Sequence, residues 1–338
     1  MNYRSTQRRT LLVCAAAVAA LALPLIGSAQ SGNVSGQLVL YTSQPDKDMK
    51  GTIAEFNKKY PAVKVEVFRS GTTEVLNKLR TEFSAGAPQP DLVLLADAVS
   101  MEALKKDGRL MALKSVDVSG IPPQFYDHDK YYIGTKVITS GLVVNTKAKF
   151  KPTSWKDLLN PELKNQIAMP SPLYSGAAAI SLGAWLDDPA LGGWNYVDGL
   201  KANGAIAVRG NGAVLQQVAN GEKSVGILVD FMALNAKAKG SPVEFVIPKE
   251  GLTFVTEPVA VLKTAKNVPA AEAFVHFLLS QEGQKFSTTL GYVPILKGVK
   301  TPDGYPPTEQ MKFMPLDTGK ILDGIEPNKK RFGDIFGG

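Results

Sequence analysis

The sequence is poor in the residues on which much protein chemistry depends. Its 338 residues include one cysteine and two histidines, and 20% of them are charged. The cysteine, Cys14, lies in the first thirty residues, so a chain that loses this segment can form no disulfide, thiolate metal site or cysteine nucleophile. A hydrophobic share of 44% excludes a disordered chain and is typical of a globular protein large enough for two domains.

Motifs for enzymatic chemistry are equally scarce. The sequence has no Gly-x-Ser-x-Gly elbow, no Gly-x-x-x-x-Gly-Lys-Ser/Thr loop and no His-Glu-x-x-His helix. His128 lies in a polar turn and His276 lies off the apolar face of a predicted helix, and neither has a nucleophile at a catalytic spacing. Gly210-Asn211-Gly212 is too short a pattern to indicate a dinucleotide site. We therefore predict no catalytic residue, no metal ligand and no cofactor.

The N-terminal segment has the features of an export signal. Its first ten residues carry three arginines and no acid, residues 11–26 are apolar, and Gly27-Ser28-Ala29 supplies the small residues that a signal peptidase needs. This apolar run is shorter than the roughly twenty residues that span a bilayer, so we predict a cleaved signal peptide at residues 1–29 rather than an anchor. Arg8-Arg9 also fits a weak twin-arginine signal, which leaves the export route open.

The charge that remains after cleavage is small. Loss of the three arginines lowers the formal net charge from +7 to +4. The sequence has no dense stripe of Lys and Arg with interleaved aromatic residues, so we predict no nucleic-acid partner. A modest positive excess favours an anionic small molecule. We expect such an exported, thiol-free chain in the periplasm.

Short apolar runs alternate with amphipathic stretches along the whole chain. Strands are predicted at residues 38–41, 63–68, 92–95, 142–145, 167–169, 206–208, 225–229, 243–247 and 257–262. Helices are predicted at residues 49–60, 75–83, 101–108, 154–159, 176–187, 190–203, 213–220, 231–239 and 270–290. This alternation predicts parallel βαβ units and an α/β fold. The number of predicted elements is larger than one sheet usually holds, and we therefore expect two α/β lobes.

Small polar residues stand between a predicted strand and the next predicted helix at four places. A helix N-terminus offers free N–H groups and the positive end of the macrodipole, and both favour an anion. One such junction alone is more often an ordinary N-cap, but open α/β sheets bind their ligands at the carboxyl ends of strands. These junctions give nine candidate ligand-binding residues: Thr42, Ser43, Ser70, Thr72, Ser171, Ser175, Gly176, Ala177 and Asn211.

Four strings of residues resemble one protein family. They are Leu-Val-Leu-Tyr-Thr-Ser at 38–43, Pro-Asp-Leu-Val at 90–93, Pro-Thr-Ser-Trp-Lys-Asp-Leu-Leu at 152–159, and the run from Ala270 to Gln284 that contains Phe-Leu-Leu-Ser-Gln-Glu-Gly-Gln. With them the chain resembles the periplasmic solute-binding proteins of ABC transporters, in the branch of the ferric-ion, hexose-phosphate and 2-aminoethylphosphonate binders. These are scaffold motifs, so they indicate the family and not the ligand.

The resemblance implies a two-lobed, type II periplasmic-binding-protein fold with a ligand cleft between the lobes. We expect lobe 1 to begin with residues 30–135, lobe 2 to span 136–257, and residues 258–338 to return to lobe 1 and end in C-terminal helices. The implied hinge consists of strands that cross near 134–140 and 255–260. The implied partner is an ABC permease in the inner membrane, and the family implies a monomer.

The same resemblance bears on iron. Ferric binders of this branch hold the metal with a tandem tyrosine pair before a second-lobe helix, and here Val229 and Asp230 occupy the matching positions. Tyr131-Tyr132 is a tandem pair, but it precedes Gly134 near the expected crossover. In relatives that bind phosphorylated organic solutes, the position of Asp230 holds an acid that faces the organic part of the ligand.

Two acids are candidates for a cationic group on the ligand. Asp230, beside serine and glycine helix ends, would suit a zwitterion with an anionic head and an amine, although it can equally serve as the N-cap of its own helix. Glu257, fixed by Pro258, is the second candidate, with an exposed strand-end carboxylate as the alternative. Ser140 matches a segment that lines the cleft in such proteins. Arg69 is a candidate phosphate partner by its charge, with a solvated surface arginine as the alternative. Three aromatic residues are assigned to the core or the cleft wall: Tyr41, Tyr174 and Trp185.

The predicted function is capture of a small phosphorus-oxyanion compound, with 2-aminoethylphosphonate first. A sugar phosphate or ferric iron is the alternative within the branch. An exported hydrolase on the same fold is the alternative from another class, and its titratable pair would have to be Asp230 with Glu257.

Overall fold

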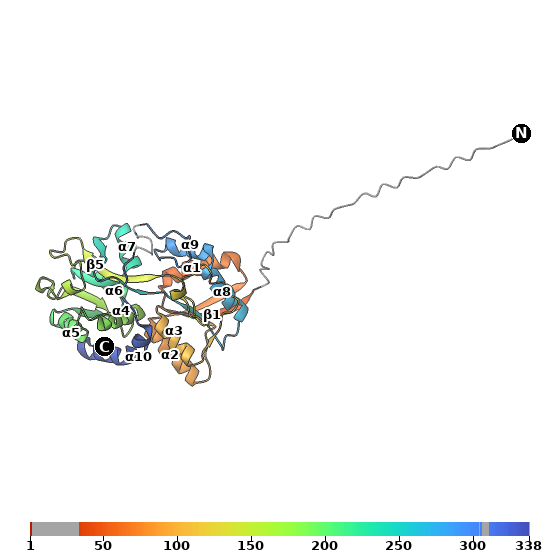
Figure 1. Ribbon diagram of the computed structural model, residues 1–338, viewed down its shortest axis with the longest axis horizontal. Coiled ribbons are helices and arrows are strands. Elements are labelled where there is room, and N and C mark those ends of the chain that lie inside the picture. Colours follow the sequence, from red (N-terminus) through yellow and green to blue (C-terminus); the bar gives the residue numbers. More distant parts are fainter. Residues whose placement is uncertain (2–33, 304, 306–310, 338) are drawn as a thin grey trace. The chain divides into compact units, whose positions relative to one another are not determined.

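The computed structural model describes residues 1, 34–303, 305 and 311–337 (Figure 1). Apart from Met1, the predicted signal peptide lies outside these residues. All elements named below belong to the unit Val34–Gly338. In this described part of the chain, no helix is both long enough and apolar enough to cross a membrane.

The first sheet has the strand order β2-β1-β3-β11-β4. In it, β1 (Gly36–Thr42) pairs in parallel with β2 (Val63–Arg69) and β3 (Leu92–Leu94). The late strand β11 (Val259–Leu262) runs antiparallel to β3 and to β4 (Leu110–Met111). Because β1, β2 and β3 are parallel, their carboxyl ends meet at one edge of the sheet.

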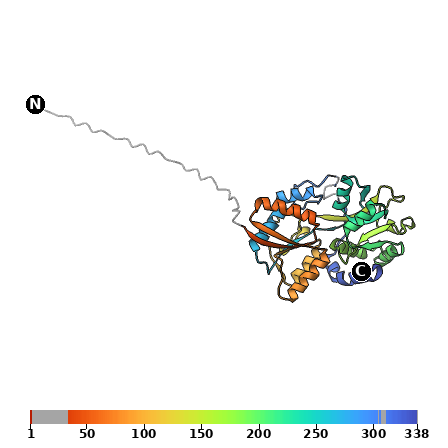
Figure 2. The ribbon, with the colours of Figure 1, turned by 180° about the vertical axis from the view of Figure 1, so that it is seen from behind.

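Five helices accompany this sheet, and together they form what we call the first lobe. They are α1 (Asp46–Lys59), α2 (Thr72–Ser84), α3 (Ala98–Lys106), α8 (Val268–Leu279) and α9 (Gln281–Thr289). Helix α8 packs on β1 and β11, and α9 packs on α1. Segments far apart in the sequence therefore share one core, and the orange and blue ribbons lie together in Figures 1 and 2.

The helix that we predicted over residues 270–290 is two helices. Ser280 separates α8 from α9 with an extended backbone, at φ −71° and ψ 160°. Its Oγ accepts a hydrogen bond from the Gly283 N–H and donates to the Phe277 carbonyl oxygen. Ser280 thus ends one helix and caps the next. The apolar periodicity continues across the break, which is why the sequence pattern did not reveal it.

The second sheet has the order β10-β5-β8-β6-β7, and β9 also pairs with β5. Its strands are β5 (Ile138–Asn145), β6 (Ile167–Pro170), β7 (Ile206–Val208), β8 (Val225–Val229), β9 (Val243–Val246) and β10 (Thr253–Val255). Strands β6, β7 and β8 are mutually parallel, whereas β5 is antiparallel to β8. The carboxyl ends of β6, β7 and β8 therefore share an edge.

Helices follow each of these parallel strands, and with the second sheet they form the second lobe. They are α4 (Gly176–Asp187), α5 (Trp194–Ala202), α6 (Asn211–Ala219) and α7 (Asp230–Ala238). The stretch predicted as a helix at 154–159 is a 3₁₀ turn, η2 (Lys156–Leu159), followed by η3 (Pro161–Leu163); a further turn, η1 (Pro123–Phe125), lies before the crossover. The α/β architecture with two sheets is as predicted.

Two chain segments cross side by side between the sheets. The Thr135 and Lys136 N–H groups donate to the Thr256 carbonyl oxygen, and Val255 pairs with Ile138. The C-terminal helix α10 (Thr318–Phe336) contacts α4 and α5 of the second lobe and α3 of the first (Figure 1). The two lobes are thus joined through backbone hydrogen bonds at the crossing and through α10.

The aromatic cluster of the first lobe gives a stability test. The Phe56 side chain is fully buried, and its ring lies 4.9–5.8 Å from those of Tyr60, Phe274 and Phe277. Phe56→Ala should lower the free energy of unfolding by about 3–5 kcal/mol, because it removes apolar contacts and leaves a cavity. The exposed Val67 on edge strand β2 supplies the control, since Val67→Ala should cost less than about 0.5 kcal/mol. Equal shifts of the urea midpoint in the two variants would contradict this assignment.

Candidate ligand-binding site

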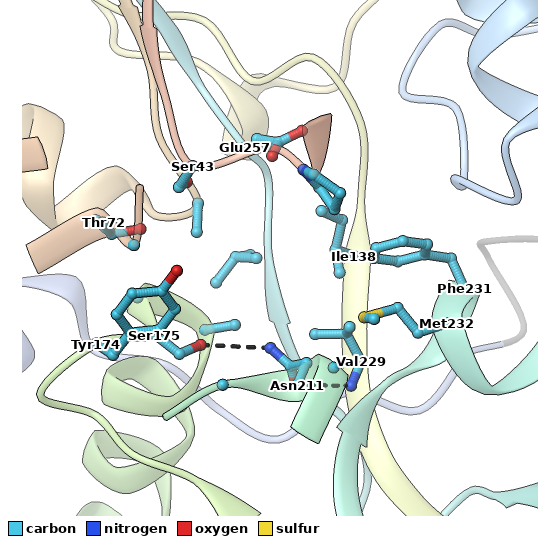
Figure 3. Close-up of a pocket in the computed structure, with 18 of the residues that line it drawn as sticks. Ser43, Thr72, Ile138, Tyr174, Ser175, Asn211, Val229, Phe231, Met232 and Glu257 are labelled. Atoms are coloured by element: carbon cyan, nitrogen blue, oxygen red, sulfur yellow. Dashed lines mark hydrogen bonds between the residues drawn. The ribbon is translucent and has the colours of Figure 1, made fainter. Parts of the chain in front are cut away.

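A cleft of about 380 Å³ lies where the strand ends of both lobes meet (Figure 3). It is lined from the first lobe by the residues after β1 and β2, from the second lobe by the N-terminal ends of α4, α6 and α7, and at its base by the crossing segments. Its polar lining residues are Ser43, Arg69, Thr72, Tyr174, Ser175, Arg209, Asn211, Glu257 and Tyr292. This is the edge at which open α/β sheets bind ligands.

The first lobe contributes hydroxyl groups and an arginine. Thr72 is 2% exposed, and among the described residues its Oγ1 has no hydrogen-bond partner; the same holds for the Ser43 Oγ. Helix α2 is capped by Gly71, whose lack of a side chain leaves the first-turn N–H groups without a side-chain acceptor. Arg69, at the end of β2, reaches into the same space. A buried hydroxyl without a partner carries a desolvation cost, which a ligand oxygen would remove.

The second lobe contributes two further helix ends. Ser175 caps α4, where its Oγ accepts a hydrogen bond of 3.3 Å from the Ala178 N–H, and Gly176 and Ala177 face the cleft. Gly210 precedes α6 without a side-chain cap, and the Asn211 Oδ1 accepts a hydrogen bond of 3.3 Å from the Val229 N–H. Backbone donors and two macrodipoles therefore point toward the cleft from this side.

The two lobes touch at the N-terminal ends of α2 and α4. A Cβ on Gly71 would lie 2.5 Å from the Tyr174 carbonyl oxygen, and one on Gly176 would lie 2.8 Å from the Thr72 Oγ1 and would clash with the Asp97 carboxylate. No side chain fits at either glycine. The structure is therefore that of a closed cleft.

One wall of the cleft is apolar. Five side chains form it, from β5, β8, α7 and β10: Ile138, Val229, Phe231, Met232 and Val255. The aromatic ring of Phe231 lies 4.4 Å from that of Tyr292. The hydroxyl-bearing side chains Ser43, Thr72, Tyr174 and Ser175 thus lie on one side of the cleft, and Ile138, Val229, Phe231 and Met232 lie on the other (Figure 3).

A buried ion pair forms the base of the cleft. Lys136 and Glu257 are each 3% exposed, and the Lys136 ammonium binds the Glu257 Oε2 and lies 4.6 Å from the centre of the Tyr292 ring. Burial raises the pKa of Glu257, and the charge of Lys136 opposes this rise. Glu257 has a φ of +40°, held by a hydrogen bond of 2.7 Å from the Thr135 Oγ1 to its carbonyl oxygen. Such a backbone is strained for a residue other than glycine and persists because its surroundings fix it.

Seven of the twelve candidate residues from the sequence line this cleft: Ser43, Thr72, Ser175, Gly176, Ala177, Asn211 and Glu257. The other five do not line it. Four of these are serines and a threonine that make local hydrogen bonds or lie elsewhere in the fold: Thr42, Ser70, Ser171 and Ser140. The Thr42 Oγ1 donates to the Leu94 carbonyl oxygen at 2.9 Å, which ties β1 to β3. The Ser70 hydroxyl donates to Glu74, and the Ser171 Oγ accepts from the Leu173 N–H at 3.2 Å. Ser140 lies on β5 and borders a small void beneath α4.

Asp230 is the fifth, and the structure gives it a different role from the expected contact with an amine. Its carboxylate is buried behind the apolar wall, where Oδ2 accepts from the Thr139 N–H at 2.9 Å and from the Thr139 hydroxyl at 2.5 Å. Oδ1 accepts from the Phe231 N–H at 2.7 Å. The neighbours Val229 and Phe231 face the cleft instead. Asp230, the first residue of α7, thus anchors this helix end to β5.

The tandem tyrosines also lie away from the cleft. The Tyr132 hydroxyl donates to Glu102 at 3.0 Å, and Tyr131 lies beneath the Lys105 ammonium at 5.2 Å. Across the described residues there is no group of three or more His, Cys, Asp or Glu side chains arranged to hold a metal ion.

Two polar lining residues, Arg209 and Tyr292, were not predicted. Arg209 directly follows β7, as Ser43 follows β1, so its position after a strand was a usable signal. Tyr292 lies beyond α9 and reaches the cleft only through the tertiary fold, for which the sequence offers no local pattern.

A comparison with family models finds one match, "Bacterial extracellular solute-binding protein", over residues 51–312. A curated spermidine/putrescine-binding periplasmic protein 1 of Haemophilus influenzae is 26% identical, covering 72% of this chain and 71% of that protein.

Two solved structures are similar over almost the whole fold. The periplasmic binding protein AfuA of Actinobacillus pleuropneumoniae, with fructose-6-phosphate bound, has a TM-score of 0.80 at 25% identity and covers 89% of this chain and 98% of its own. Iron-bound HitA of Pseudomonas aeruginosa has a TM-score of 0.76 at 22% identity and covers 88% and 99%. The two-lobed fold and the family resemblance predicted from the sequence are confirmed.

The buried carboxylate of Asp230 predicts a pH effect on stability. Burial raises its pKa from 3.8 to about 6, although hydrogen bonds from Thr139 and Phe231 oppose the rise. Between these values the native state holds more protons than the unfolded state, so the free energy of unfolding falls as pH rises from 4 to 6. At about 1.4 kcal/mol per pKa unit, and with the unfolded carboxyl already partly titrated at pH 4, wild type should lose about 2 kcal/mol relative to Asp230→Asn between pH 4 and pH 7. Parallel stability curves from denaturant titrations would refute this.

Proposed function

The chain belongs to the bacterial extracellular solute-binding proteins, and we propose that its solute is a small phosphorus-oxyanion compound, with 2-aminoethylphosphonate as the first candidate. Its homologues are periplasmic binding proteins of ABC importers, and this chain is the extracytoplasmic, solute-binding component of such a system. The ligand is the part that we propose from the geometry of the cleft.

The observation that carries the proposal is the convergence of positive groups on one cleft. Arg69 from the first lobe and Arg209 from the second both line it, together with the N-terminal ends of α2, α4 and α6. The unpartnered hydroxyls of Ser43 and Thr72 add donors among the described residues. A tetrahedral oxyanion has several acceptor atoms and so can use donors from both lobes at once.

The organic part of the ligand would then lie on the apolar wall. A two-carbon chain needs no hydrogen-bond partner there, and its ammonium group would reach Glu257 and the aromatic rings of Tyr292 and Phe231. This assigns to Glu257 the role that Asp230 cannot fill.

A sugar phosphate is the second candidate, because the neighbour AfuA has fructose-6-phosphate bound. The wall formed by Ile138, Val229, Met232 and Val255 disfavours it, since sugar hydroxyls buried there would lose hydrogen bonds to water. The two arginines would repel a polyamine, and iron would lack a tandem tyrosine pair, because Val229 and Asp230 occupy the matching positions.

Capture requires no covalent chemistry. The open protein would bind the solute, the lobes would rotate about the crossing segments at Thr135 and Thr256, and the closed surface would be read by the inner-membrane permease. The hydrolase alternative would need Asp230 and Glu257 in one cleft, and only Glu257 lines it.

Isothermal titration calorimetry tests the ligand class. Wild type should bind 2-aminoethylphosphonate more tightly than glucose 6-phosphate and inorganic phosphate, and should not bind putrescine or ferric citrate. Arg69→Ala should weaken the binding of every phosphorus compound about 10- to 100-fold, as loss of a charge-assisted hydrogen bond implies. Binding of iron or putrescine with no response to any phosphorus compound would disprove the proposal, and product formation would disprove simple capture.

A substitution at Glu257 tests the contact with the amine. Glu257→Gln should weaken 2-aminoethylphosphonate about tenfold or more relative to ethylphosphonate, which has the same head and no ammonium group. The single variant leaves Lys136 buried without its partner, so Lys136→Met/Glu257→Gln serves as the second variant. Equal losses for both compounds in the double variant would show that Glu257 does not meet the amine.

A further inference from the structure

Tyr174 lies between the two arginines of the cleft. It belongs to the loop between β6 and α4 in the second lobe, and its hydroxyl accepts a hydrogen bond of 3.1 Å from the Nη1 of Arg69, in the first lobe. The guanidinium carbon of Arg209 lies 4.7 Å from the centre of the same ring. One side chain therefore contacts both arginines, through its hydroxyl and through its ring face.

The surroundings of Tyr174 hold it in place. Gly71 of the first lobe lies against its carbonyl oxygen and ring, so closely that an added Cβ would lie 2.5–2.6 Å from them. On the other side a Cβ on Gly210 would lie 3.1 Å from the ring. The loop itself is folded by Ser171, whose backbone carbonyl accepts from the N–H groups of Tyr174 and Ser175. The ring thus has little freedom when the lobes are closed.

The arginines keep donors free for a ligand in this arrangement. Arg209 uses Nη2 to bind the Glu74 carboxylate at 2.9 Å, and no other hydrogen bond of its guanidinium is made within the described residues. Arg69 uses three donors: Nε binds the Gln44 carbonyl oxygen, Nη2 binds the Ser43 carbonyl oxygen, and Nη1 binds the Tyr174 hydroxyl. A guanidinium has five N–H groups, so both arginines retain unused ones.

We propose that Tyr174 is a positioning residue that aligns Arg69 and Arg209 on a single ligand oxyanion when the lobes close; this rests on the proposed function. The Arg69 hydrogen bond crosses between lobes, so it exists only in the closed state. In the open state Arg69 keeps its bonds to Ser43 and Gln44 of its own lobe but loses Tyr174, so its Nη1 end must give up side-chain entropy to bind an anion. Tyr174 therefore links closure to capture.

A double-mutant cycle tests this role. Tyr174→Phe removes the acceptor for Arg69 but keeps the ring beneath Arg209, and it should weaken 2-aminoethylphosphonate about tenfold. In the Arg69→Ala background the same change should matter less than about twofold, because Tyr174 acts through Arg69. Tyr174→Leu also removes the ring and should cost about two- to fivefold more.

The control is Tyr60→Phe, since Tyr60 stacks on Phe56 away from the cleft and should leave affinity unchanged. An unchanged affinity in Tyr174→Phe would overturn the proposal. So would a tenfold loss that persists in the Arg69→Ala background, because the tyrosine would then act independently of that arginine.

A distance measurement separates this proposal from the choice of ligand. The chain from residue 30 has no cysteine, so spin labels can be placed at Lys50→Cys on the first lobe and Lys164→Cys on the second, both exposed. If wild type binds no phosphorus compound, the proposed function fails, and the label distances decide the role of Tyr174. A smaller closed population in Tyr174→Phe than in wild type supports the cross-lobe contact, and identical distributions overturn it.

Discussion

The buried ion pair of Lys136 and Glu257 is the interaction on which the rest of the site depends. It joins the two segments that cross between the lobes, and it forms the base of the cleft. Two charges with 3% exposure are expensive to bury, and this cost is balanced only when each has the other within reach. The pair therefore favours one alignment of the crossing segments over others. This alignment in turn fixes the positions of the strand ends on either side.

The division of the cleft into two chemical sides follows from this geometry. Parallel strands deliver helix N-termini to their carboxyl edge, so positive backbone ends gather there from β2, β6 and β7. The antiparallel strands β5 and β10 enter from the crossing and bring Ile138 and Val255. A ligand with one anionic end and one hydrocarbon end matches a site built in this way.

Much of the fold was predictable because its elements are defined by local periodicity. The alternation of strands and helices from β1 to α7 appears in the sequence as apolar runs and helical spacings. The short strands β4 and β10 do not, because they lack an apolar run bounded by turn residues and form by pairing with the edge of a neighbouring strand. The break at Ser280 was hidden for the opposite reason, because the apolar pattern runs on through it.

The lining of the cleft was predictable where a residue stands between a strand and the next helix, as for Ser43, Thr72, Ser175 and Asn211. The lining was not predictable where two residues of the same chemistry differ only in the direction in which their side chains point. Asp230 and Glu257 are both carboxylates at strand ends, and only their tertiary surroundings turn one inward to Thr139 and the other to the cleft.

The two glycines at the meeting point of the lobes have a consequence for the size of the solute. Because neither Gly71 nor Gly176 has room for a side chain, the lobes meet at the Tyr174 carbonyl oxygen and ring and at the Thr72 and Asp97 side chains, and these contacts set the height of the closed cleft. A solute that is too tall holds these surfaces apart, and one that is too short leaves its far donors unused. Full closure therefore requires a solute of matching height, and the cleft selects its solute by size before the closed protein meets the permease.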